Sequence, residues 1–233
     1  MTRWLLAMLL AALALTPSMA RAGRAEDAAR RVRPQLAADL AAADLRFGAP
    51  VLLRIFKHEH ELEVWVDDGA RFRRFRTYPI CTFSGAPGPK LRQGDGQAPE
   101  GFYSVGAGQL NPYSSYHLSF DLGYPNAYDR AHGRTGSLLM VHGDCVSIGC
   151  YAMGDAQIEQ IYTLVAAALA GGQRRVEVHA FPFRYATPPD PHWRRGEWGA
   201  FWAELEPAYR ALEATGKAPV VRVVGRRYVV DAR

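Results

Sequence analysis

Residues 140–153, MVHGDCVSIGCYAM, hold one histidine and two of the chain's three cysteines. The apolar residues before His142 predict a short buried strand that ends at this histidine, and Asp155 is a suitable N-cap for an amphipathic helix that follows. The stretch therefore links a strand to a helix through a tight segment that contains both cysteines. Three explanations fit this grouping: a metal site, a disulfide, or a thiol nucleophile with a histidine base.

A metal site is the first explanation. The spacing His142-x2-Cys145-x4-Cys150 supplies three zinc ligands, whereas zinc needs four, or three and a water. His117 and His132 are the available additional ligands, but the sequence has no Cys-x-x-Cys pair to anchor the set. We therefore expect neither a metal nor another cofactor.

A disulfide is the second explanation, because cysteines of exported proteins usually pair. Cys145 can pair with Cys150 across a small loop, or with Cys81, and the sequence does not decide between these. An odd number of cysteines leaves at least one thiol unpaired within the chain or linked to another chain. We favour Cys81 with Cys145, because the remaining thiol, Cys150, then has the better chemical surroundings.

A thiol nucleophile is the third explanation. A free cysteine has a pKa near 8.5, so it needs a base, a positive charge or a helix N-terminus to react at neutral pH. Cys150 has His142 nearby in sequence and precedes the predicted helix. Gly143 and Gly149 allow tight bends, and the backbone N–H of Cys150 is a candidate oxyanion donor.

The rest of the chain predicts a β-rich α+β domain, a sheet or sandwich with one helix after Cys150 and helices near both ends. Residues 25–45 predict two short helical pieces separated by Pro34. The other predicted elements are strands within 51–83, a Gly- and Pro-rich loop at 84–101, strands at 102–105 and 114–123, a loop at 124–136, a helix that ends at Gly171 and Gly172, a strand within 174–183, a helix around 197–216 and a strand pair within 219–232. Trp193, Trp198 and Trp202 are candidates for glycan binding, although the spacing of Trp198 and Trp202 on one helix face is better explained by burial.

The N-terminus predicts export. Residues 1–22 have a positive Arg3, a twelve-residue apolar core and an Ala20-Arg21-Ala22 cleavage site, which together are typical of a signal peptide. The apolar core is shorter than a membrane-spanning helix needs, so we expect no stable membrane insertion after cleavage. The expected divisions are 1–22 signal peptide, 23–50 helical segment, 51–183 catalytic domain and 184–233 C-terminal extension.

The charge distribution gives little support for nucleic-acid binding. Removal of residues 1–22, which contain two arginines and no acidic residue, lowers the formal net charge from +5 to +3. The basic residues are scattered, and the sequence has no zinc-finger or RNP pattern. We therefore expect no nucleic-acid partner.

Three motifs resemble the YkuD-type L,D-transpeptidases, bacterial cysteine enzymes that remodel peptidoglycan. They are GDGQAPEGFYSV (94–105), VHG (141–143) and SIGC (147–150). The longer stretch YHLSFDLGYPNAYDRAHGRTGSLLMVHGDCVSIGCYAM (116–153) is similar to the YafK-like branch of this family. The resemblance implies the L,D-transpeptidase fold over roughly residues 50–183.

The resemblance makes Cys150 the nucleophile and His142 the general base, with Ser147 and Gly149 shaping the turn that places the thiolate. Two departures stand out. Ile148 replaces the histidine of the usual family motif, and only four residues separate Gly143 from Ile148, where the family spacer exceeds ten. The polarising role of that histidine and part of the lid over the site are therefore in doubt.

The family implies acyl transfer in the periplasm on peptidoglycan stem peptides, at a diaminopimelate carbonyl and through a thioester. An amine acceptor gives a cross-link or an attached lipoprotein, and water gives an amidase. The YafK-like branch is associated with release of a wall-linked outer-membrane lipoprotein. The alternative is a non-catalytic peptidoglycan-binding module with the same fold, which the replacement by Ile148 favours.

Further residues are candidates for substrate contact. Arg130, His132 and Arg134 precede the predicted catalytic strand, and guanidinium groups suit the carboxylates of stem peptides. Tyr116 and Tyr128 are candidates to line the cleft.

Overall fold

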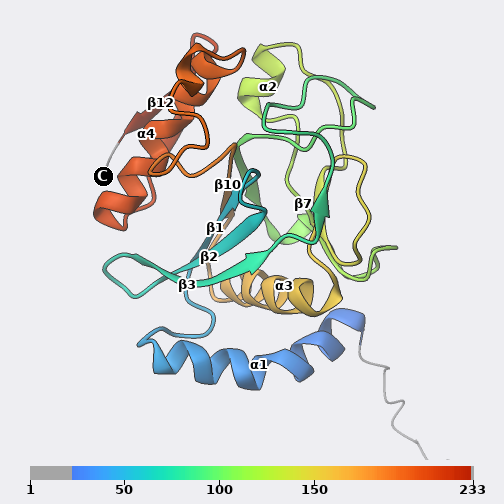
Figure 1. Cartoon of the computed structure of the whole chain (residues 1–233). Coiled ribbons are helices and arrows are strands. Elements are labelled where there is room, and N and C mark those ends of the chain that lie inside the picture. Colours follow the sequence, from blue (N-terminus) through green and yellow to red (C-terminus); the bar gives the residue numbers. More distant parts are fainter. Residues whose placement is uncertain (1–22, 232–233) are drawn as a thin grey trace, which may run out of the picture.

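The computed structural model describes residues 23–231, and the signal peptide predicted over 1–22 lies outside these residues. The helices are α1 (Arg24–Ala42), α2 (Ala127–Ala131), α3 (Asp155–Ala170) and α4 (Gly199–Thr215), with 3₁₀ turns η1 (Ala107–Gln109) and η2 (Trp193–Arg195). The strands are β1 (Val51–Phe56), β2 (Glu61–Asp67), β3 (Phe72–Pro79), β4 (Thr82–Phe83), β5 (Gly101–Val105), β6 (Leu110–Asn111), β7 (Ser119–Asp121), β8 (Met140–His142), β9 (Tyr151–Ala152), β10 (Val176–Phe181), β11 (Val220–Val224) and β12 (Arg227–Asp231). The prediction of a β-rich α+β domain is confirmed (Figure 1).

Two five-stranded sheets form the centre of the molecule. The first has the order β3-β2-β1-β10-β5, and the second has the order β4-β9-β8-β7-β6. Strands β8 and β9 run parallel, although only residues 143–150 connect them. Parallel strands usually need a connection of a dozen or more residues. The segment that contains Cys145 and Cys150 is therefore a short loop that runs from the end of β8 back to the start of β9, beside the start of β8.

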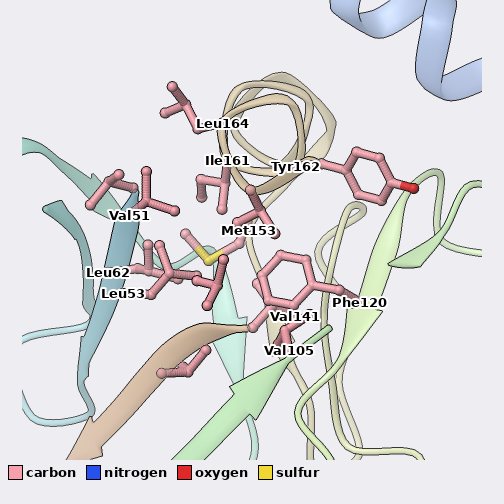
Figure 2. Packing of buried hydrophobic residues seen from close by; sticks show 14 of the residues in the cluster. Val51, Leu53, Leu62, Val105, Phe120, Val141, Met153, Ile161, Tyr162 and Leu164 are labelled. Carbon is pink, nitrogen blue, oxygen red and sulfur yellow. The ribbon is translucent and has the colours of Figure 1, made fainter. Parts of the chain in front are cut away.

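The main hydrophobic core lies between the two sheets and α3. Figure 2 shows Ile161 of α3 facing side chains from both sheets, among them Leu53 of β1 and Phe120 of β7. All three side chains are fully buried. Burial of such a side chain stabilises the fold by about 1.5–3 kcal/mol, so this core fixes β8 and β9 against α3.

Helix α1 is continuous, so the prediction of two helical pieces was wrong. α3 lies between α1 and the strands (Figure 1), and α1 buries Ala28, Leu36 and Leu40. Pro34 lies inside α1 on its exposed side. A proline removes one helical hydrogen bond, but the packing of the buried face holds the helix together across it.

The C-terminal segment packs on the first sheet through an aromatic cluster. Phe56 of β1 and Phe181 of β10 meet Tyr209 of α4, with ring centroids 5.7–6.0 Å apart. Trp193 is buried in this cluster and Trp202 packs against it. The prediction that Trp202 serves packing is confirmed, and Trp193, a candidate for glycan binding, is buried as well. The strand pair expected at the C-terminus is the hairpin β11–β12.

Three local predictions need correction. The expected loop at 124–136 contains α2, because Asn126 Oδ1 accepts the Asp129 N–H and caps the first turn. The strand expected over 114–123 is only β7, because residues 114–117 form turns. Asp155 is the first residue of α3 and not its N-cap, which is Gly154 at φ +77°.

A buried charged pair fixes the Gly- and Pro-rich loop of residues 84–100. Lys57 Nζ lies 3.3 Å from Glu100 Oε1, and both side chains are fully buried. The Lys57 ammonium also donates to the carbonyls of Gly88 and Ala98, and Glu100 accepts the Trp202 indole N–H. The pair therefore joins the end of β1, the loop and α4.

Within residues 23–231, none of the helices has the length and apolar character needed to cross a bilayer.

Candidate active site

Cys150 lies directly before β9 and beside β8. The register pairs Val141 with Tyr151 and His142 with Ala152. The Met140 N–H points to the Cys150 Sγ at 3.4 Å, and this thiol lies 3.6 Å from the Leu138 carbonyl oxygen, which accepts its hydrogen. Cys150 is half-buried and is the free cysteine of the chain.

The other two cysteines form a disulfide. Cys81 and Cys145 are bonded, with their Cα atoms 5.5 Å apart and a sequence separation of 64. The Cys81 N–H also donates to the Ala152 carbonyl of β9. The favoured pairing is therefore confirmed. It ties the 143–150 loop to the segment between β3 and β4, and it removes Cys145 from the zinc ligand set considered above.

The turn before Cys150 is organised by Ser147 and Gly149. Ser147 Oγ donates to the Cys150 carbonyl at 2.7 Å and accepts the Gly149 N–H at 3.2 Å. Gly149 has φ +129°, and a Cβ there would lie 3.2 Å from Leu139 Cδ1. A side chain at this position is therefore disfavoured by conformation and by space. The Gly149 N–H is occupied, so the Cys150 N–H is the better candidate oxyanion donor.

His142 is buried at the end of β8. Its Nδ1 donates to the Gly143 carbonyl at 2.5 Å, since a carbonyl oxygen only accepts. The Nε2 atom of this neutral tautomer therefore carries the lone pair. The Tyr116 ring lies against the imidazole, with centroids 4.7 Å apart.

The register of β8 and β9 indicates that the side chains of His142 and Cys150 lie on the same face of this strand pair. Because Val141 and Tyr151 are paired, Cys150 lies beside Met140, which its contact with the Met140 N–H supports. Alternate residues of a strand point the same way, so the His142 and Met140 side chains share a face, roughly 7 Å apart along the strand. The loop thus returns the thiol to the face that carries the imidazole.

The electrostatics of this pair favour neutral groups. Burial raises the pKa of the Cys150 thiol, and the Met140 N–H offsets part of this rise. Burial lowers the pKa of His142, against the opposing effects of the Gly143 carbonyl and the Asp144 carboxylate. The thiol contacts come from residues 138–140 and not from the start of α3. The loop therefore turns the sulfur toward β8, and a contribution of the α3 N-terminus to thiol activation stays a prediction.

Of the five residues predicted to contact substrate, Tyr116 lies beside His142. Tyr128 is buried, with its ring stacked on Tyr228 and His132 at centroid distances of 4.2 Å each. Arg134 is also buried and pairs with Asp129 at 2.8 Å. These two side chains already have internal partners, which argues against substrate contact.

His132 and Arg130 also have internal partners. The His132 Nε2 donates to the Arg226 carbonyl of the C-terminal hairpin at 2.7 Å. Arg130 is exposed and donates to the Pro125 carbonyl. The DRAHGRTG motif thus packs α2 against the C-terminal segment, and its basic residues give no sign of a shared binding surface.

Sequence reasoning missed two supports of the site. Tyr151 is fully buried, and its hydroxyl donates to the Pro99 carbonyl at 2.6 Å. The 84–100 loop therefore contacts β9, the strand that directly follows Cys150. Glu100 holds this loop through Lys57 and Trp202. A glutamate within a Gly- and Pro-rich loop was the available signal, but its partners are distant in sequence.

Comparisons with known proteins show the family of this chain. Residues 50–209 match the model of the YkuD family, the L,D-transpeptidase catalytic domain. The protein named "Putative L,D-transpeptidase YafK" of Escherichia coli K12 is 48% identical over 184 residues, which cover 79% of this chain and 75% of that protein. The same protein of Escherichia coli O157:H7 matches equally.

Solved structures with partial similarity come from two other bacteria. The helical cell shape determining protein Pgp2 of Campylobacter jejuni is 24% identical with a TM-score of 0.46, over 57% of this chain and 48% of that chain. Bd1075 of Bdellovibrio bacteriovorus is 20% identical with a TM-score of 0.39, over 58% and 49%. The chain thus spans about half the length of these two proteins. On the family match and the identity to the Escherichia coli protein, this chain belongs to the YkuD family of L,D-transpeptidase catalytic domains.

Proposed function

We propose that this protein is a periplasmic cysteine enzyme that acts on peptidoglycan stem peptides through a thioester on Cys150. The observation that carries the proposal is the short parallel β8–β9 connection, from which the free thiol and the His142 imidazole leave the same face. The family membership supplies the reaction class. A free thiol, an oriented imidazole and a nearby backbone N–H are the components that acyl transfer requires.

The first step forms the thioester. The Cys150 sulfur attacks the carbonyl carbon at the L-centre of diaminopimelate, and its proton passes to the His142 Nε2. The carbon–nitrogen bond to the leaving amine then breaks, and the imidazolium returns the proton to that amine. Because both groups are neutral at rest, His142 acts as a general base during the attack and does not hold a preformed thiolate.

Gly143, Ser147 and Gly149 have supporting roles in this proposal. The Gly143 carbonyl fixes the His142 tautomer. Ser147 and Gly149 form the turn that aims the thiol and leaves the Cys150 N–H free to bind the oxyanion. One oxyanion donor is worth about 2.7–4 kcal/mol in an enzyme where this was measured.

The second step decides the product. An amine acceptor gives a cross-link or an attached lipoprotein, and water releases the stem peptide as an acid. We favour water, with a wall-linked lipoprotein as the leaving group, because the YafK-like branch that the sequence resembles is associated with this release and because Ile148, two positions before the nucleophile, is apolar. Residues 51–183 hold this chemistry in our division of the chain, and 184–233 cover the first sheet.

A binding module is the second candidate function. The raised pKa of Cys150 and the 88% exposed Ile148 side chain, which replaces the polar family residue, favour it. Such a module would bind stem peptides and leave them unchanged.

Mass spectrometry of muropeptides tests the proposal. The purified protein without residues 1–22, and its Cys150→Ala variant, are incubated with sacculi that carry bound lipoprotein. Loss of the lipoprotein-derived residues in the wild-type sample alone establishes an amidase. New cross-links or newly attached lipoprotein establish a transpeptidase, and unchanged sacculi that retain both proteins equally favour the binding module.

A further inference from the structure

One peptide group beside His142 is hydrogen-bonded at both ends. Its carbonyl oxygen, on Gly143, accepts the His142 Nδ1–H at 2.5 Å. Its N–H, on Asp144, donates to the Asp155 Oδ1 at 2.8 Å. The Asp155 carboxylate and the His142 imidazole are thus connected through a single peptide.

The surroundings hold this peptide in place. The Gly143 N–H donates to the carbonyls of Tyr116 and Leu118 at 3.1 and 3.0 Å. A Cβ on Gly143 would lie 2.6 Å from the Asp155 Oδ1, so the close approach of the carboxylate requires glycine. Asp144 has φ +57°, a conformation uncommon for a non-glycine residue. These contacts fix the peptide orientation on which both hydrogen bonds depend.

The physical effect of Asp155 follows from the polarisation of the peptide. A carboxylate that accepts the N–H of a peptide shifts electron density toward its carbonyl oxygen, and hydrogen bonds in such a chain strengthen one another. The Gly143 carbonyl then binds the Nδ1–H more strongly. A stronger acceptor at Nδ1 favours the imidazolium that forms when Nε2 takes a proton.

We propose that Asp155 is a positioning residue that acts on His142 through the Gly143–Asp144 peptide, holding the Nδ1–H tautomer and raising the basicity of Nε2. In serine proteases an aspartate contacts its histidine directly, whereas here a peptide group stands between them. This inference rests on the proposed function, in which His142 is the base. It also explains why Asp155 does not cap α3: its carboxylate is bonded to the loop.

A structural role is the competing explanation. An aspartate in the first turn of α3 stabilises that helix through its dipole, whatever happens at His142. The other titratable groups around His142 are Asp144 in the loop, Tyr116 and His117 in the preceding turn, and Cys150 before β9. The test must therefore separate an effect on His142 from an effect on folding.

The experiment compares Asp155→Ala, Asp155→Asn and Asp155→Glu with the wild type. Asparagine keeps an acceptor of similar shape without the charge, and glutamate keeps the charge. Glu197→Gln, a change at an exposed carboxylate of the C-terminal segment, is the control for net charge. The measurements are the NMR titration of His142, the rate of Cys150 alkylation by iodoacetamide as a function of pH, and the thermal unfolding temperature. His142→Gln identifies the His142 signal.

We expect Asp155→Ala to lower the His142 pKa and to slow alkylation at neutral pH by about tenfold, less than the 10²–10⁴ that loss of a general base costs. Asp155→Asn should fall between alanine and the wild type, and Asp155→Glu should restore most of the effect. The proposal is wrong if the alanine and asparagine variants keep the wild-type titration and alkylation profile, even with a lower unfolding temperature. These measurements do not use sacculi. They therefore test the effect of Asp155 on His142 independently of the muropeptide experiment.

Discussion

Lys57 and Glu100 form an ion pair whose two side chains have no exposed surface, with Nζ and Oε1 3.3 Å apart. The pair lies where β1, the 84–100 loop and α4 meet. Its carboxylate also accepts the Gly88 N–H and the Trp202 indole N–H. Removal of the carboxylate therefore leaves a buried ammonium without its counter-charge, and leaves the Gly88 and Trp202 N–H groups without their acceptor.

We predict that Glu100→Ala lowers the free energy of unfolding by about 3–5 kcal/mol, the usual cost of removing one member of a buried pair. Urea unfolding followed by tryptophan fluorescence measures the change. Asp231→Asn in the exposed Arg222–Asp231 pair is the control and should have little effect. Equal losses in the two variants would contradict the structural importance given to the Lys57–Glu100 pair.

The Cys81–Cys145 disulfide predicts the number of reactive thiols and a contribution to stability. Without reductant, the folded protein should take up one alkyl group, on Cys150, and after reduction and denaturation it should take up three. Closing a loop of 64 positions contributes about 4 kcal/mol in the chain-entropy description, so the double variant Cys81→Ser, Cys145→Ser should unfold at a lower denaturant concentration. Alkylation at Cys145 in the unreduced protein would contradict the pairing.

The pH dependence of Cys150 alkylation tests whether the Cys150 thiol is neutral in the resting protein. Because burial raises its pKa, the rate should rise with pH to a midpoint above the value near 8.5 of an ordinary thiol. Intact-mass spectrometry after timed reaction with iodoacetamide gives this profile, and Cys150→Ala provides the background. A midpoint well below 8.5 would indicate a thiolate–imidazolium pair and would contradict the proposed general-base step.

The sequence predicted the elements that local patterns determine. Apolar runs identified β8 and β10, and the glycine pair after residue 170 identified the end of α3. Asn126 shows the limit, because its capping of α2 is local, yet the glycines and proline around it resemble a loop. Pro34 shows the opposite case, in which packing against α3 overrides a local helix breaker.

The site was less predictable, since its partners are distant in sequence. Cys150 and His142 were recognisable from motifs, but Tyr151 meets Pro99 and Glu100 meets Trp202 across 52 and 102 positions. The direction of the Cys150 pKa shift depends on burial, which the motif does not encode. Tyr128, a candidate to line the cleft, is buried against Tyr228, which lies 100 positions away in sequence.

Asp95 in the GDG motif predicts a loss of stability in acid. Burial opposes its ionisation, but hydrogen bonds from Lys90 and from the backbone of Arg92, Leu91 and Gln97 hold its pKa at about 2. A depressed carboxyl pKa contributes stability above the unfolded value near 4, and this contribution is lost as the pH falls toward 2. We expect Asp95→Asn to cost about 2 kcal/mol at neutral pH and less than about 0.5 kcal/mol at pH 2, where half of the carboxyl groups are protonated.

Urea unfolding of the wild type and Asp95→Asn across this pH range gives the difference between the two proteins. Asp190→Asn, in an exposed turn where Asp190 Oδ1 accepts the His192 N–H, is the matched control. A difference between wild type and Asp95→Asn that does not change with pH would show that Asp95 acts by shape and not by charge.

Substitution of Ile148 should change the choice between an amine and water as acceptor without changing the stability of the fold. Its side chain is 88% exposed two positions before Cys150, so Ile148→His should change the unfolding free energy by less than about 0.5 kcal/mol. An imidazole at the rim can accept a proton from an incoming amine, which an alkyl group cannot. We therefore expect Ile148→His to increase amine transfer relative to hydrolysis severalfold, measured as D-amino-acid incorporation into muropeptides, whereas Ile148→Val keeps the wild-type ratio. An unchanged ratio in the folded histidine variant would mean that acceptor choice is made elsewhere, such as by the short 143–150 loop that limits the lid over the thiol.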